Sequence, residues 1–154
     1  MVIHIFSIIL CLILRYLCNL WTTAFYRIMI SAPKKLLAVI EFIEHAQYPA
    51  IYKALGYDVT TEWQVRKAVS LIRKMTPDVI VADFYFQSDF RDRLSNLESL
   101  LAATQLLKEI RVLVFYEPHN ESVLDKVRQR MRIDAALPMP ATDEAIKAVL
   151  KEWL

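Results

Sequence analysis

The chain has 154 residues, the length of a single domain, and Gly56 is its only glycine. A single glycine excludes the glycine-rich phosphate loops of both the Walker type and the dinucleotide-binding type. The formal net charge of +2 belongs to residues 1–33, which hold two basic residues and no acidic one. Residues 34–154 are balanced in charge, so the basic excess that nucleic-acid binding requires is missing. We therefore expect no nucleic-acid partner.

Residues 2–26 form an apolar segment long enough to cross a bilayer as a helix, which takes ~20 residues. Arg15 lies near its middle and costs roughly 2.5–3.5 kcal/mol on an insertion scale, which the surrounding Ile, Leu and Phe residues offset. Lysine and arginine follow the segment and none precedes it, so the positive-inside rule predicts a cytoplasmic domain anchored to the inner membrane. An alternative of equal weight is that the chain starts at Met29 and that residues 1–28 are upstream sequence.

Strand and helix patterns alternate five times in residues 34–154, which we expect to form one domain after an apolar N-terminal helix in residues 1–33. Apolar or alternating runs predict strands at residues 35–41, 57–60, 78–83, 111–116 and 134–137. Apolar residues at helical spacing predict helices at residues 47–55, 62–75, 94–108, 121–131 and 142–153. The short connections predict parallel strands joined by right-handed crossovers, with helices on both faces of the sheet.

The third of these strands has no polar face. Residues 79–82 read Val-Ile-Val-Ala, with Asp78 before them and Asp83 after them. A strand that is apolar on both faces is covered on both faces, which indicates the centre of a parallel sheet. An acid at the carboxyl end of such a strand lies where open α/β sheets bind their ligands. Asp83 is therefore the first candidate for a functional residue.

Other side chains that can carry chemistry have weaker support. His45 and His119 have no partner at metal-ligand or catalytic-triad spacing, so we expect both to be solvated. The aromatic residues at 84–86 and Phe90 follow Asp83, and we expect them to pack locally in the core. The alternatives are a cap over the pocket at Asp83 and a partner-binding patch.

Several short motifs occur in a consistent order along residues 34–154. They are Ile40-Glu41 after the first strand, Gly56-Tyr57-Asp58-Val59, the run 77–83, and Leu137-Pro138-Met139-Pro140. In this order and spacing they resemble the receiver domain of bacterial two-component response regulators. The resemblance implies a flavodoxin-like, three-layer α/β sandwich with a five-stranded parallel sheet of order 2-1-3-4-5. It also implies that Asp83 is the phosphoryl-accepting aspartate and that a cis-bonded proline follows the fifth strand.

Three positions depart from the pattern of receiver domains. The family has two acids after the first strand, but here Ile40 replaces one of them and Glu41 remains. Tyr116 stands where the family has Ser or Thr, and Met139 stands where it has a lysine. Glu41 and Asp83 still provide two carboxylates, so magnesium bound by this pair is the alternative to our expectation of no cofactor and no confident metal site. We interpret Glu41 and Asp83 as a vestigial acidic pocket, in which loop amides donate hydrogen bonds to Asp83.

Our first hypothesis for function is a degenerate, stand-alone receiver-like signalling domain that is not an enzyme and acts by binding a protein, without a full phosphorylation cycle. By resemblance, the partner surface comprises residues 116–131 and 142–153. The first alternative is a working single-domain response regulator that a histidine kinase phosphorylates on Asp83. A flavodoxin-like cofactor binder or enzyme ranks last, because the ends of the strands lack phosphate-binding Gly, Ser or Thr loops.

Overall fold

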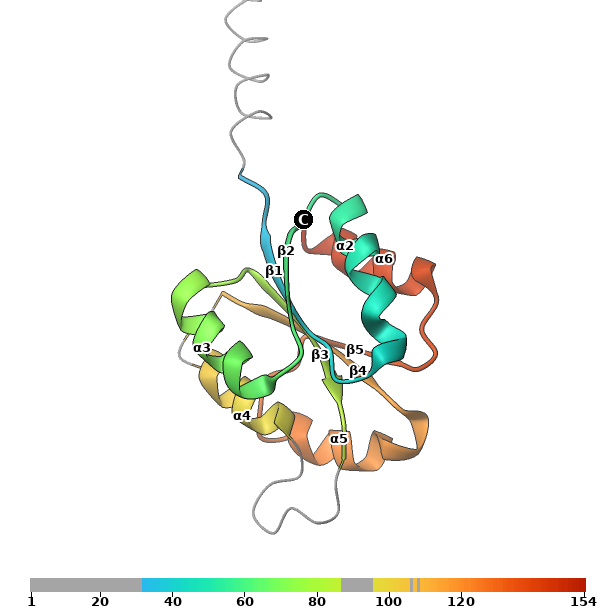
Figure 1. The fold of residues 1–154 in the computed structure, drawn as a ribbon. Coiled ribbons are helices and arrows are strands. Elements are labelled where there is room, and N and C mark those ends of the chain that lie inside the picture. Colours follow the sequence, from blue (N-terminus) through green and yellow to red (C-terminus); the bar gives the residue numbers. More distant parts are fainter. Residues whose placement is uncertain (1–31, 87–95, 106, 108) are drawn as a thin grey trace, which may run out of the picture. The chain divides into compact units, whose positions relative to one another are not determined.

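Five parallel strands form one sheet in the order β2-β1-β3-β4-β5 (Figure 1). The computed structural model describes residues 32–86, 96–105, 107 and 109–154. Its strands are β1 (Lys35–Val39), β2 (Asp58–Glu62), β3 (Val79–Phe84), β4 (Arg111–Tyr116) and β5 (Ala135–Pro138). Its α-helices are α2 (Tyr48–Ala54), α3 (Val65–Met75), α4 (Asn96–Thr104), α5 (Glu121–Arg128) and α6 (Asp143–Glu152). Two 3₁₀ turns, η1 (Ile43–Gln47) and η2 (Pro118–Asn120), follow β1 and β4. The predicted sheet and its strand order are confirmed.

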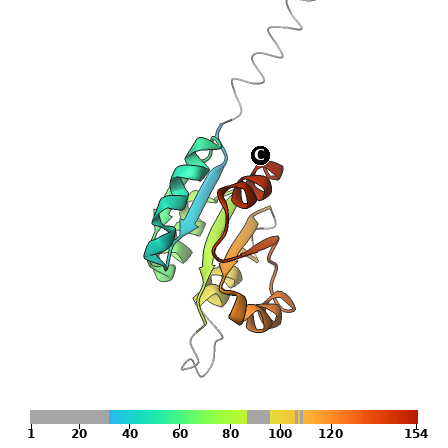
Figure 2. The same cartoon turned by 90° about the vertical axis from the view of Figure 1, so that its right-hand side faces the viewer.

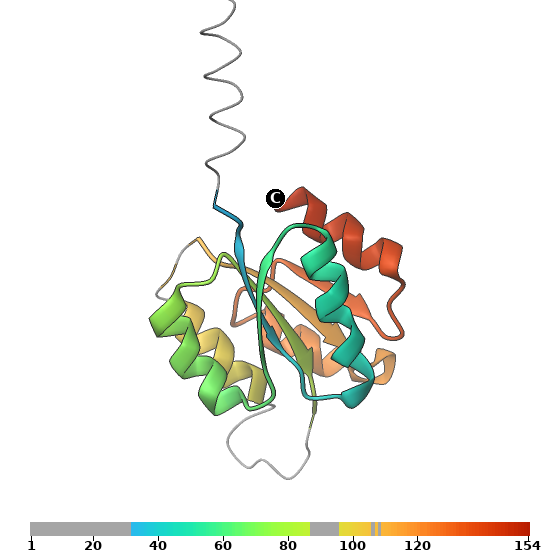
Figure 3. The same ribbon diagram turned by 45° about the horizontal axis from the view of Figure 1, so that its top comes forward.

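Helices cover both faces of the sheet and make three layers. Figure 2 shows α2 and α6 in front of the sheet and α3 and α4 behind it, and Figure 3 shows the same two layers from another side. Buried residues of α5 belong to the same apolar cluster as those of α3 and α4, so α5 completes the second layer. The fold is therefore the three-layer α/β sandwich that the sequence predicts.

Strand β3 is buried along its whole length because both of its faces pack against helices. Val79 and Val81 belong to the apolar cluster that contains residues of α2 and α6. Ile80, Ala82 and Phe84 belong to the cluster on the opposite face, with residues of α3, α4 and α5. Successive side chains of a strand point to opposite faces, so a run without polar residues fills two cores at once. The prediction that β3 is the central strand is confirmed by its pairing with β1 and β4.

The ends of several elements differ from the predicted ones. Strand β2 runs on to Glu62, because its backbone carbonyl accepts a hydrogen bond from the N–H of Ile40 at 3.0 Å. The predicted helix at 94–108 ends at Thr104, whose hydroxyl donates to the carbonyl of Leu101 at 2.7 Å. The chain then turns more tightly, because the N–H of Leu107 donates to the carbonyl of Thr104, three residues back, at 2.8 Å.

The C-terminal part of the domain contains the predicted helix and the predicted cis-bonded proline. Thr142 caps α6, and its hydroxyl oxygen accepts a hydrogen bond from the N–H of Ala145 at 3.2 Å. The bond between Met139 and Pro140 after β5 is cis. The predicted helix at 121–131 is shorter than expected, since α5 ends at Arg128.

The predicted apolar N-terminal helix lies outside the described residues. In the part of the chain that the structure describes, no helix is both long and apolar enough to cross a membrane.

Candidate functional site

The carboxylate of Asp83 is buried at the end of β3, with 3% of the residue exposed. Side chains alternate along a strand, so Asp83 lies on the same face as Val81, under α2 and α6. Its Oδ2 accepts hydrogen bonds from the backbone N–H groups of Glu41 at 2.8 Å and Phe42 at 3.2 Å. Its Oδ1 lies 2.6 Å from Nδ1 of His45. Both carboxylate oxygens are therefore engaged by nitrogen donors from the segment that follows β1.

His45 belongs to η1 and is 6% exposed, so our expectation of a solvated side chain is wrong. The reason is the short turn after β1, which folds back over the end of β3 and places the imidazole against Asp83. A carboxylate accepts hydrogen bonds and cannot donate them, so Nδ1 of His45 is the nitrogen that carries the proton. His119, in contrast, has 72% of its side chain exposed and lies 3.3 Å from Glu117, which confirms the expectation of a solvated histidine there.

Aromatic rings enclose the imidazole of His45. Tyr48 stacks on it, with the two ring centroids 5.2 Å apart, and Phe42 and Phe115 approach it edge-on at 5.5 and 5.7 Å. Burial and the charge of Asp83 raise the pKa of Tyr48, so its hydroxyl stays protonated at neutral pH. These rings pack around the imidazole, and the bond between His45 and Asp83 is buried beneath them.

The three positions that depart from the receiver pattern supply no positive charge near Asp83. Ile40 is buried in the apolar cluster of the α2 and α6 face. Tyr116 is buried and lies in the opposite cluster, where its hydroxyl donates to Glu121 at 3.3 Å and the guanidinium of Arg128 lies 5.9 Å from its ring centroid. Met139 follows β5 and lines a pocket beside His45.

The carboxylate of Asp83 is a poor magnesium ligand as it is placed. Three of the roughly four lone-pair sites on its two oxygens accept hydrogen bonds from Glu41, Phe42 and His45. Within the described residues, no group of three or more His, Cys, Asp or Glu side chains is arranged to hold a metal ion.

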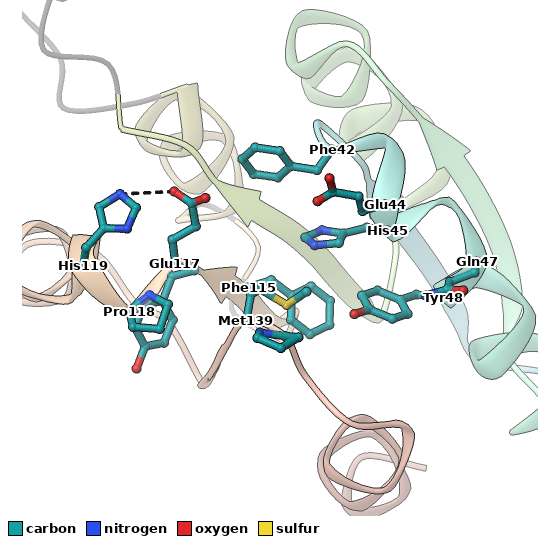
Figure 4. A pocket seen from close by; sticks show the side chains of 12 residues that line it. Phe42, Glu44, His45, Gln47, Tyr48, Phe115, Glu117, Pro118, His119 and Met139 are labelled. Atoms are coloured by element: carbon teal, nitrogen blue, oxygen red, sulfur yellow. Dashed lines mark ion pairs between the residues drawn. The ribbon is translucent and has the colours of Figure 1, made fainter.

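A pocket of about 420 Å³ adjoins His45 at the carboxyl ends of the strands (Figure 4). Three segments line it: residues 42–48 after β1, residues 115–119 at the end of β4 and in η2, and Met139 with Pro140 after β5. Its charged lining residues are the carboxylates of Glu44 and Glu117. Sequence reasoning did not predict this pocket, because its walls come from three loops far apart in the chain.

The aromatic residues that follow β3 behave in two ways. Phe84 is fully buried and Phe86 packs against the same core cluster, so the expectation of local core packing is confirmed for these two. Tyr85 is 39% exposed, and its ring centroid lies 5.6 Å from that of Phe42. The prediction for Phe90 falls outside the described residues.

Comparisons with known proteins find similarity in structure. No family model matches the chain, and no curated protein matches it. The signal receiver domain of a putative LuxO repressor protein from Vibrio parahaemolyticus is 17% identical, with 79% of this chain and 90% of that chain covered and a TM-score of 0.65. The chemotaxis protein CheY4 of Vibrio cholerae is 22% identical, with coverage of 80% and 100% and a TM-score of 0.61. A CheY-like receiver domain from Methylobacillus flagellatus is 15% identical, with coverage of 80% and 100% and a TM-score of 0.63. The chain therefore has the fold of receiver domains, as the sequence motifs predict.

Proposed function

We propose that this chain is a receiver-like signalling domain that acts by binding a protein partner, without a phosphorylation cycle at Asp83. One observation carries the proposal. The carboxylate of Asp83 is buried and accepts hydrogen bonds from two backbone amides and from His45. An aspartate used in this way ties the segment after β1 to the end of β3, which is a structural task.

Phosphoryl transfer to Asp83 requires the opposite arrangement. The attacking oxygen needs open space in line with the phosphorus, and nearby cations must neutralise the charge of the transferring group. Here the imidazole of His45 lies 2.6 Å from Oδ1, and Met139 stands at the position of the family's lysine. Charge-assisted hydrogen bonds contribute about 1.5–3 kcal/mol each, so freeing the carboxylate for attack is costly.

The partner surface in this proposal is the α5–α6 surface, defined as residues 116–131 and 142–153. The buried residues of α5, Leu124 and Val127, hold this helix on the core and leave its charged face exposed. Tyr116 lies at the edge of the surface, between Glu121 and Arg128, so a partner that contacts these two residues also changes the surroundings of the tyrosine.

A mass measurement tests the absence of phosphorylation. The full chain is incubated with magnesium and acetyl phosphate, beside a competent receiver protein as a positive control, and its intact mass is recorded. We expect no added phosphoryl group. A mass increase of one phosphoryl group that disappears in Asp83→Asn contradicts the proposal and identifies a working response regulator.

Binding measurements with charge-reversed variants test the partner surface. Lys126→Glu alters the exposed side of α5, and Lys67→Glu makes the same change on α3, outside the α5–α6 surface. We expect a protein captured by the wild-type chain to be lost with Lys126→Glu and kept with Lys67→Glu. A partner that Lys126→Glu keeps, or that both variants lose, contradicts this assignment of the surface.

A further inference from the structure

The pocket beside His45 presents a buried hydrogen-bond acceptor. In the neutral imidazole of His45, in which Nδ1 carries the proton that is donated to Asp83, the other ring nitrogen, Nε2, carries a lone pair. His45 lines the pocket, and Nε2 has no hydrogen-bond partner among the described residues. A buried acceptor without a partner is unfavourable, so this nitrogen calls for a donor that enters the pocket.

The ionised groups of the pocket are mainly negative. Glu44 and Glu117 line it, and among the described lining residues there is no lysine or arginine. Of the two histidines in the lining, His45 is bonded to Asp83, and His119 is exposed and lies 3.3 Å from Glu117. Carboxylates on the walls of a cleft concentrate cations and repel anions. A phosphoryl group or a carboxylate is therefore a poor ligand for this pocket.

Aromatic side chains form the apolar walls. Phe42, Tyr48 and Phe115 line the pocket together with Met139 (Figure 4). The face of an aromatic ring attracts cations, and its area also packs against apolar groups. The volume of about 420 Å³ falls within the range typical of small-molecule sites, which is roughly 300–1,000 Å³.

We propose that this pocket binds a small organic cation, namely a protonated amine on an aromatic or aliphatic body. The ammonium donates a hydrogen bond to Nε2 of His45 and is attracted by the carboxylates of Glu44 and Glu117. The apolar body packs against the aromatic walls. This site goes beyond the proposed partner binding, because it gives the domain a small-molecule ligand at the place where receivers carry out phosphoryl chemistry. It does not depend on the α5–α6 surface.

An NMR titration of the ¹⁵N-labelled full chain tests the proposal with three probes of matched shape. Benzylamine carries the cation, benzyl alcohol is neutral and benzoate is an anion. We expect benzylamine to shift the resonances of the pocket residues, including Nε2 of His45, with a dissociation constant of about 1 mM or tighter. Benzyl alcohol should bind about tenfold more weakly, and benzoate should cause no shifts.

Surface variants separate the ligand site from effects on folding. The double variant Glu44→Gln, Glu117→Gln removes both carboxylates and leaves the buried His45 and Asp83 in place. We expect it to bind benzylamine about tenfold more weakly than the wild type does, and to bind benzyl alcohol with the affinity of the wild type. The control is Asp58→Asn, which removes an exposed carboxylate at the start of β2, and it should bind benzylamine like the wild type. The proposal is overturned if benzylamine causes no shifts in the pocket, if either other probe binds equally well, or if the double variant retains full affinity.

Discussion

Replacing Asp83 by alanine should destabilise the domain strongly, because three donors lose their acceptor at once. The N–H groups of Glu41 and Phe42 and Nδ1 of His45 all point at this carboxylate. The residue is 3% exposed, so water cannot replace the lost partner without opening the structure. Each buried donor left without an acceptor costs about 1–3 kcal/mol, so the loss of all three amounts to at least about 3 kcal/mol, a large share of a typical domain stability of about 5–15 kcal/mol.

Asp83→Asn provides an internal comparison for this loss. The amide oxygen of asparagine still accepts from the loop amides, and its NH₂ group donates to Nδ1 of His45 once the imidazole proton moves to Nε2. We therefore expect a loss of about 1–2 kcal/mol for asparagine, well below the loss for alanine.

Urea unfolding followed by circular dichroism measures both differences, with Asp58→Ala as an exposed control that should change stability by about 0.5 kcal/mol or less. If Asp83→Ala costs less than about 1 kcal/mol, the hydrogen bonds that we assign to this carboxylate do not hold the loop, and the structural role of Asp83 is refuted.

Three further variants test other contacts of the domain. His45→Ala removes the bond to Asp83 and the stack on Tyr48. Urea unfolding should show that the free energy of unfolding falls by about 2–4 kcal/mol. An unchanged urea midpoint would contradict the buried contact between His45 and Asp83. Tyr57→Phe removes a 2.7 Å hydrogen bond to the carbonyl of Leu150 and should cost about 1 kcal/mol. Burial and the charge of Asp78 raise the pKa of Tyr57 from 10.0 to about 12. The wild type should therefore lose stability as the pH rises from 10 towards 12, and Tyr57→Phe should lose less over this range. Parallel stability curves for the two proteins would refute this. Thr142→Ala removes the N-cap of α6 and should lower the melting temperature through a loss of about 1 kcal/mol, whereas an unchanged melting temperature would show that the cap contributes nothing.

Much of the fold follows from the spacing of apolar residues. A strand with apolar residues on both faces can only lie between two layers of helices, and β3 is such a strand. The length of the helices is less predictable, because it depends on local competition for backbone hydrogen bonds. After Thr104 the N–H of Leu107 bonds the carbonyl of Thr104 in a tighter turn, and α4 ends there, although leucine residues continue the helical pattern beyond it.

The candidate site was predictable in part. Asp83 stood out because it ends the central strand, but its partner His45 lies 38 positions earlier in a segment without a motif. The missing information is the path of the chain after β1, where the 3₁₀ turn η1 directs the imidazole back to β3. One signal was available in the sequence: β1 and β3 are neighbours in this sheet order, so any histidine within a few residues of the end of β1 can reach the end of β3.

Beryllofluoride, a mimic of the phosphoryl group on aspartate, tests the central claim most directly. The mimic is added with magnesium to the ¹⁵N-labelled full chain, and the amide resonances of Glu41 and Phe42 and the Nδ1 proton of His45 are followed. These three donors report on the carboxylate of Asp83 itself. The structural role of Asp83 predicts that all three resonances stay unchanged at a beryllofluoride concentration that saturates a competent receiver protein. Saturable shifts of the three resonances, absent in Asp83→Asn, would show that the carboxylate leaves its donors to accept a phosphoryl group, and would contradict the account.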